Sequence, residues 1–162
     1  MANLKEIRIR ITSVSSTMQI TSAMKMVSAA KLKKAQDAIT AMRPYSNKLS
    51  ELMQGLSGAS SSGEKSYTSK REIKKVLILA ISSNRGLCGA FNANIAKEVN
   101  VVKSRKEFKK AEINFLSIGK KINDILSKTE KVIQNDSDVF SDLNYERVSQ
   151  IANKVMDLYI HQ

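Results

Sequence analysis

The chain has 162 residues, a hydrophobic fraction of 42% and a formal net charge of +12. This length suffices for one domain with a core plus one extended appendage, and the hydrophobic fraction excludes wholesale disorder. No run approaches the ~20 apolar residues of a membrane-spanning helix, and Cys88 is a single cysteine, so no internal disulfide can form. The positive charge predicts an acidic partner. Nucleic acid, anionic lipid and an acidic protein surface all remain open at this point.

Residues 1–56 predict one long helix that carries a coiled-coil seam. Apolar or small residues recur at spacings that alternate between three and four, which is the heptad pattern. Asn3 is predicted to cap this helix. Pro44 is predicted to break or kink it, because proline lacks a backbone donor and its ring disrupts the previous turn. The predicted seam consists of Leu4, Ile7, Ile11, Val14, Met18, Leu32, Ala35, Ile39 and Met42.

Within this helix, residues 17–36 read TMQITSAMKMVSAAKLKKAQ and combine lysines and methionines. No Asp or Glu occurs between Glu6 and Asp37, whereas a solvated helix normally mixes charges of both signs. We interpret the helix as two-faced, with one face paired to a partner helix and a basic, methionine-bearing face docked on something acidic. An ordinary amphipathic helix packed on its own domain is the alternative.

The rest of the chain predicts a second region. Residues 57–72 are rich in Ser and Gly and predict a linker. Residues 73–162 predict an incomplete α/β domain, in which strands alternate with helices in βαβ units of a Rossmann-like, three-layer fold. The apolar run at 75–82 is typical of a central parallel strand that is buried on both faces. Further strands are predicted at 111–118 and, weakly, 131–134, and helices at 93–108, 120–126 and 145–160.

The turn NRGLCGAFN at 84–92 lies between a predicted strand and a predicted helix, where dinucleotide-binding folds place their phosphate loop. It lacks the first close glycine pair of GxGxxG and the Gly-Lys-Ser/Thr of a Walker loop. We interpret it as a tight turn and predict no cofactor site. Cys88 and His161 lack a third orienting group for nucleophilic catalysis and are too few for a structural zinc site. The sequence therefore predicts neither catalytic nor metal-binding residues.

Two motifs together resemble the signatures of the γ subunit of F-type ATP synthase: the N-terminal IRIRITSVSSTMQITSAMKMVSAAKLKKAQ and the internal SSNRGLCGAFN. The resemblance runs from Met1 through the first βαβ unit, and beyond about residue 110 it depends on the order of elements. It implies a non-catalytic central-stalk rotor subunit that couples proton-driven rotation to ATP synthesis by conformational cycling of the catalytic β subunits. Its N-terminal helix would pair with a C-terminal helix. The implied partners are the α, β and ε subunits and the c-ring.

The resemblance also implies a location and an interface. The location is peripheral, at the cytoplasmic face of the bacterial inner membrane, with attachment only through the complex and no specific nucleic-acid partner. In this family an acidic helix-turn-helix segment of β faces the shaft. The implied interface with β consists of Met24, Lys25, Met26, Lys31, Lys33, Lys34, Arg85, Leu87 and Cys88.

Members of that family continue to a long C-terminal helix, so we expect this chain to be an N-terminal fragment whose bare seam self-associates. Without the resemblance, the same patterns indicate a basic coiled-coil adaptor or a nucleic-acid-binding protein with an α/β domain. The pI of 9.9 favours the nucleic-acid alternative, whereas the aromatic content of 5% argues against stacking on bases.

Overall fold

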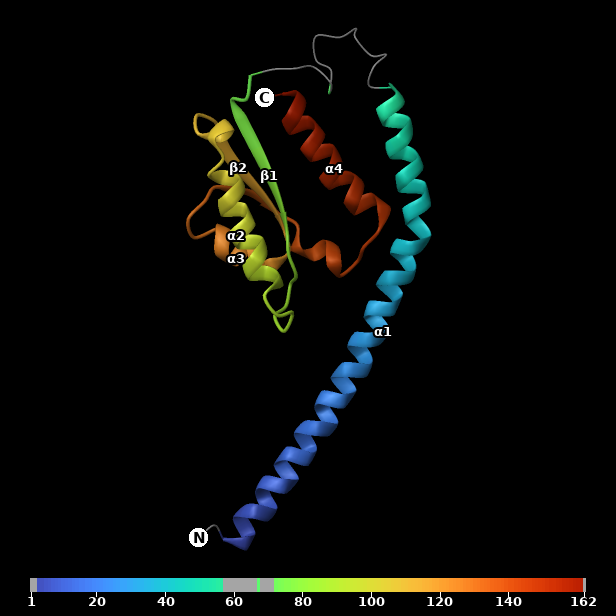
Figure 1. Cartoon of the computed structure of the whole chain (residues 1–162), viewed down its shortest axis with the longest axis vertical. Coiled ribbons are helices and arrows are strands. Elements are labelled where there is room, and N and C mark those ends of the chain that lie inside the picture. Colours follow the sequence, from blue (N-terminus) through green and yellow to red (C-terminus); the bar gives the residue numbers. More distant parts are fainter. Residues whose placement is uncertain (1–2, 57–66, 68–71, 162) are drawn as a thin grey trace. The chain divides into compact units, whose positions relative to one another are not determined.

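A computed structural model describes residues 3–56, Tyr67 and residues 72–161. The chain divides into two compact units, Met1–Ser61 and Ser62–Gln162 (Figure 1). The predicted linker at 57–72 lies outside the described residues except for Tyr67 and Glu72. None of the helices in the described part of the chain is both long and apolar enough to cross a bilayer.

The first unit contains the helix α1, Leu4–Leu56. Asn3 caps it as predicted, since its side-chain Oδ1 accepts a hydrogen bond from the Lys5 backbone N–H at 3.3 Å. The Asn3 carbonyl accepts a second bond from the Ile7 N–H at 3.1 Å. Glu6 lies in the first turn, where a negative charge is favoured by the helix dipole.

The helix does not break at Pro44, because α1 continues through this residue to Leu56 (Figure 1). The alternative, a kink at Pro44, stays a prediction. A proline inside a helix removes one backbone donor and crowds the carbonyl four residues earlier, which here belongs to Thr40. Thr40 and its neighbours are exposed. Water can therefore bond the freed carbonyl, and the hydrogen bonds of the flanking turns hold the helix together.

The second unit is built on a parallel sheet, as the α/β prediction requires. Its strands are β1, Lys75–Ile81, β2, Glu112–Ile118, and β3, Val132–Asn135, in the order β1-β2-β3. Lys75 pairs with Glu112 and Ile81 with Ile118, so the first two strands are in register along their whole length. The weakly predicted third strand is confirmed. It begins opposite Phe115, next to a β-bulge.

Three helices of the second unit flank the sheet: α2, Phe91–Lys103, α3, Lys120–Leu126, and α4, Tyr145–Ile160. Figure 1 shows α2 on one side of the sheet and α4 on the other. The hydrophobic core lies under α2 and α3. It consists of Ala80, Val99, Phe115, Ile122 and Leu126, all at most 6% exposed. Burial of these side chains stabilises the unit by roughly 2 kcal/mol for each large one.

The structure corrects two predictions about elements of this unit. The strand predicted to be central and buried on both faces is β1, which lies at an edge of the described sheet and leaves Leu79 43% and Ile81 51% exposed. Its apolar sequence resembles that of a central strand, but of the three strands in the described residues only β2 has paired neighbours on both sides.

The helix predicted at 93–108 is α2, which begins at Phe91 and ends at Lys103. The Ser104 hydroxyl donates to the Asn100 carbonyl at 2.8 Å, and Arg105 adopts an extended conformation. A serine that bonds the backbone in this way competes with helix continuation. The chain then passes through the short 3-10 helix η1, Lys106–Phe108, before it enters β2. A second 3-10 helix, η2, spans Ser137–Phe140.

Candidate functional site

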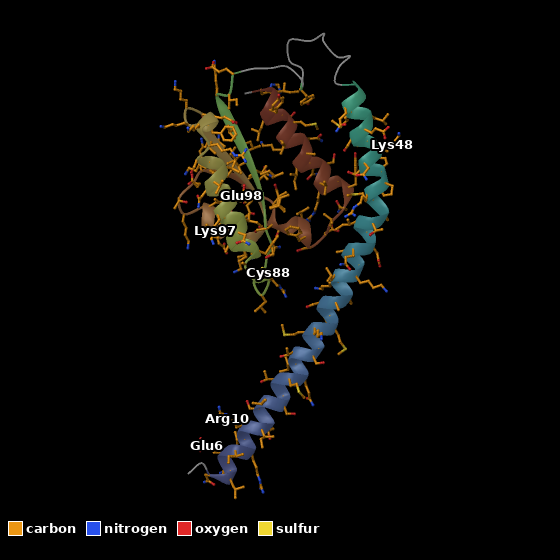
Figure 2. All side chains as sticks on the ribbon, viewed as in Figure 1. Glu6, Arg10, Lys48, Cys88, Lys97 and Glu98 are labelled. Atoms are coloured by element: carbon orange, nitrogen blue, oxygen red, sulfur yellow. The ribbon has the colours of Figure 1, made fainter. Side chains whose placement is uncertain are left out.

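The loop between β1 and α2 contains three of the predicted interface residues, Arg85, Leu87 and Cys88. Figure 2 labels Cys88 in this loop. Leu87 has a φ of 62°, in the left-handed region that an L side chain rarely adopts. Its side chain is 98% exposed, so no described residue compensates this strain by packing on it. An exposed apolar side chain on strained backbone is typical of a contact residue.

Hydrogen bonds inside this loop fix its shape. The Asn92 side chain, at the start of α2, accepts a bond from the Ser83 backbone N–H at 3.1 Å and donates to the Cys88 Sγ at 3.1 Å. The Ser83 hydroxyl donates to the Arg85 carbonyl. The sulfur of Cys88 therefore lies against the loop and is half-buried, whereas Arg85 and Leu87 are exposed.

The carboxyl edge of the sheet, where α/β folds bind phosphates, is occupied by the protein's own groups. The first three backbone N–H groups of α3 donate to residues that follow β1. Lys120 donates to the Asn84 Oδ1 at 2.9 Å, Lys121 to the Ser83 carbonyl at 3.2 Å, and Ile122 to the Ser82 Oγ at 3.0 Å. These donors are therefore not available to an anion. The described residues also contain no group of three or more His, Cys, Asp or Glu side chains arranged to hold a metal ion.

The coiled-coil seam on α1 is exposed along its whole length. Leu4 at its start is 72% exposed and Met42 at its end 60%. In proteins most of the stability of a helix comes from packing of its apolar face, so this seam is suited to a partner helix. An exposed seam of this kind is the geometry of a coiled-coil arm.

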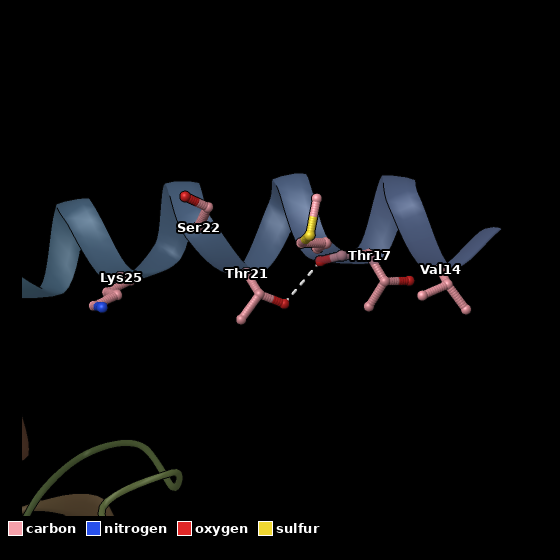
Figure 3. Close-up of a pocket in the computed structure, with 6 residues that line it drawn as sticks. Val14, Thr17, Thr21, Ser22 and Lys25 are labelled. Atoms are coloured by element: carbon pink, nitrogen blue, oxygen red, sulfur yellow. Dashed lines mark hydrogen bonds between the residues drawn. The ribbon is translucent and has the colours of Figure 1, made fainter. Parts of the chain in front are cut away.

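Two threonines beside the seam, Thr17 and Thr21, have hydroxyls that bond back to the helix, a feature not predicted from the sequence. The Thr17 hydroxyl donates to the Ser13 carbonyl at 2.9 Å. The Thr21 hydroxyl donates to the Thr17 carbonyl at 2.8 Å, the bond drawn in Figure 3. Both line a shallow groove with Val14, Met18 and Lys25. Their hydroxyls are satisfied, so a partner helix can bury both threonines without leaving these hydroxyls unpaired. The signal in the sequence was the presence of threonines inside a predicted helix, where their hydroxyls can donate to the carbonyl four residues earlier.

The lysines of the predicted basic face of α1 are distributed around the helix, and we call Lys25, Lys31, Lys33 and Lys34 the collar. Lys25, Lys31, Lys33 and Lys34 are exposed, and none makes an ion pair with a described residue. At about 100° per residue, Lys31 and Lys33 point to directions roughly 160° apart, as do Met24 and Met26. Neighbours two positions apart cannot share a side of a helix, so the interface residues predicted on α1 do not all lie on one face. The positive charge surrounds the helix.

The fold thus defines an α/β protein with a coiled-coil arm. The family model described as ATP synthase matches residues 3–162, and the chain belongs to this family. The chain is 62% identical over 164 residues to the ATP synthase gamma chain of Flavobacterium psychrophilum and 60% identical over 163 residues to that of Flavobacterium johnsoniae. It is 41% identical over 160 residues to the ATP synthase gamma chain of Geotalea uraniireducens.

These matches confirm the family that the two motifs predicted. Each covers 99% of this chain and 56% of the relative. The chain therefore spans little more than half the length of the curated relatives that it matches.

Proposed function

We propose that this chain acts as the γ-type central stalk of an F1Fo ATP synthase, a rotor that couples proton-driven rotation to ATP synthesis. The observation that carries the proposal is the exposed seam of α1 in a chain that is 62% identical to an ATP synthase gamma chain. The subunit itself is non-catalytic in this proposal. It biases the β subunits among conformations through contacts that differ from one state to the next.

The partners in this proposal are the α and β subunits around the helix and the ε subunit and c-ring at the foot. The assembly holds the chain at the cytoplasmic face of the bacterial inner membrane. A second helix, from the part of the relatives that this chain does not span, covers the seam. The back-bonded threonines beside the seam support this pairing, because their hydroxyls need no partner from the second helix.

The distribution of charge on α1 supports a shaft enclosed by its partners. A helix that docks on one surface needs charge on one side, whereas a shaft inside a ring meets subunits all round. The lysines at 25, 31, 33 and 34 point in several directions, which fits the second situation. Met24 and Met26, 53% and 66% exposed, supply flexible side chains that adapt to several conformations of a partner.

Binding to a ring of α and β subunits tests this proposal. The variant K31E/K33E/K34E should bind the ring less tightly, because three attractions to an acidic surface become repulsions. The variant K106E/K109E/K110E changes the net charge by the same amount on the second unit and is the matched control. Equal affinity of both variants and the parent would overturn the role of the collar.

Duplex DNA provides the competing ligand. A chain that prefers DNA to the subunit ring at physiological salt would overturn the rotor proposal and favour a nucleic-acid-binding protein. Weak binding to DNA at low salt is expected of any chain with a net charge of +12. The comparison must therefore be made at matched ionic strength.

A further inference from the structure

Unpaired positive charge gathers at the amino edge of the sheet, where the parallel strands begin. We call the residues Lys74, Lys75, Arg105, Lys106, Lys109 and Lys110 the amino-edge cluster. All six are exposed, and none makes an ion pair with a described residue. The carboxylates of Glu112 and Glu130 beside them are bonded to other lysines, Lys131 and Lys103. Of the described residues, Glu72 and Glu107 lie in the same segments, and the charge of Lys75 also acts on Glu112. The six cations still outnumber these carboxylates.

Strand pairing holds the two halves of this cluster together. Lys75 is directly opposite Glu112 in the register of β1 and β2, and the Glu112 N–H donates to the Lys74 carbonyl at 3.0 Å. Residues 105–110 form the connection that leads from α2 into β2. Both halves therefore lie at the edge where these two strands begin.

The cluster and the loop that carries Leu87 lie at opposite edges of the sheet. Leu87 follows the end of β1, whereas Lys74 and Lys75 stand at its start. A strand of seven residues separates the two edges by roughly 20 Å. A partner at one edge therefore leaves the other free.

The chemistry of the cluster matches a diffuse anionic surface. Five of its six members are lysines, which act as hydrated point charges, while arginine supplies the planar fork that reads a carboxylate or phosphate in fixed geometry. Beside them Ile73 is 49% exposed, an apolar side chain suited to a membrane surface. Phe108 is the one aromatic residue at 105–110 and is half-buried, so this segment offers little for stacking on bases.

We propose that the amino-edge cluster contacts anionic lipid headgroups at the membrane surface. This inference rests on the proposed rotor function. If the loop of Leu87 meets the catalytic subunits, the opposite edge of the same sheet is directed away from them, toward the membrane that holds the c-ring. The complex still anchors the chain, and the cluster adds a direct electrostatic contact.

Vesicle co-sedimentation of the whole chain tests the inference. The parent should bind phosphatidylcholine vesicles that contain phosphatidylglycerol, should not bind phosphatidylcholine alone, and should be released by salt. The variant K106E/K109E/K110E should bind roughly 100-fold more weakly, given the contribution of each lysine near an anionic membrane. Far-UV circular dichroism checks that it folds.

The matched variant K31E/K33E/K34E tests whether vesicle binding depends on where in the chain the positive charges lie. It should lose much less vesicle binding, because its charges lie on α1. Equal losses of vesicle binding in the two variants would overturn the proposed lipid contact of the amino-edge cluster. Net charge would then be the cause of binding. Loss of duplex DNA binding with unchanged vesicle binding in K106E/K109E/K110E would also overturn it. Neither result depends on the subunit ring, so a failed ring-binding test of the rotor remains a separate outcome.

Discussion

Gly119 approaches Ser82 so closely that no other residue fits at position 119. A Cβ on Gly119 would lie 2.6 Å from the Ser82 Oγ and 2.7 Å from the Ser82 carbonyl carbon, and the φ of Gly119 is 113°. This contact lets α3 begin directly beside the end of β1. The Ser82 hydroxyl can then accept the Ile122 N–H, and the carboxyl edge of the sheet is closed.

Gly119→Ala should lower the free energy of unfolding by about 3 kcal/mol, because it combines a strained backbone with a steric clash against backbone atoms. Urea denaturation followed by circular dichroism measures this. Gly86→Ala is the control, since a Cβ there meets no atom within 4 Å, and it should change stability by less than about 0.5 kcal/mol. Similar losses in both variants would contradict the steric argument.

Asn84→Ala should destabilise the second unit by about 1–2 kcal/mol. The Asn84 side chain donates to the Ser137 carbonyl at 2.9 Å and accepts the Lys120 N–H at 2.9 Å, so it joins two other segments. Its removal leaves both backbone groups without this partner. Amide exchange at Lys120 should become faster. Asn94→Ala, at an exposed position of α2, should leave this rate unchanged.

Leu87→Gly should keep the free energy of unfolding within about 0.5 kcal/mol of the parent. Relief of the left-handed strain offsets the greater entropy of glycine in the unfolded chain. Leu143→Gly is the control, because Leu143 is also exposed, at 71%, but does not have a positive φ. It should lose about 0.5–1 kcal/mol, and equal losses would contradict the strain argument. Under the rotor proposal, Leu87→Gly alone should also weaken binding to the subunit ring, by about tenfold.

Glu112 should make stability depend on pH. A hydrogen bond from the Asn114 side chain, and next the hydrogen bond and charge of Lys131, lower the pKa of Glu112 below its usual range. A lowered pKa in the folded state stabilises the fold above the unfolded pKa, and this contribution is lost as the pH falls through the folded pKa.

The urea midpoint of the parent should therefore exceed that of Glu112→Gln at pH 7 by more than it does at about pH 3. Glu98→Gln, at an exposed position of α2, gives the reference for removing one negative charge. A difference between parent and Glu112→Gln that stays constant over this range would refute the prediction.

Pro44→Ala should stabilise α1 locally by up to about 3 kcal/mol, because it restores a donor to the Thr40 carbonyl and removes the clash of the ring. Hydrogen exchange of the amides from 40 to 48 should become slower. Tyr45→Ala, at a side chain that is 71% exposed, is the control and should have a much smaller effect. Unchanged exchange in Pro44→Ala would mean that the proline does not weaken this part of the helix.

The sequence alone predicted the elements whose signals are local. The heptad spacing from Leu4 to Met42 and the cap at Asn3 predicted a long helix. The apolar runs before Ser82 and Gly119 predicted parallel strands. The motif around Cys88, together with the N-terminal segment, predicted the family. These signals lie within a few turns or one strand, so they can be read without knowing what packs against them.

Only the tertiary structure decided the relations between distant residues. The run of β1 reads as a central strand, yet among the described strands it pairs with β2 alone and lies at an edge of this sheet. Asn84 and Ser82 close the carboxyl edge through bonds to residues 36 and 40 positions away. The amino-edge cluster exists because register brings Lys74 and Lys75 beside the start of β2. Such contacts depend on the three-dimensional arrangement of segments, which local pattern does not specify.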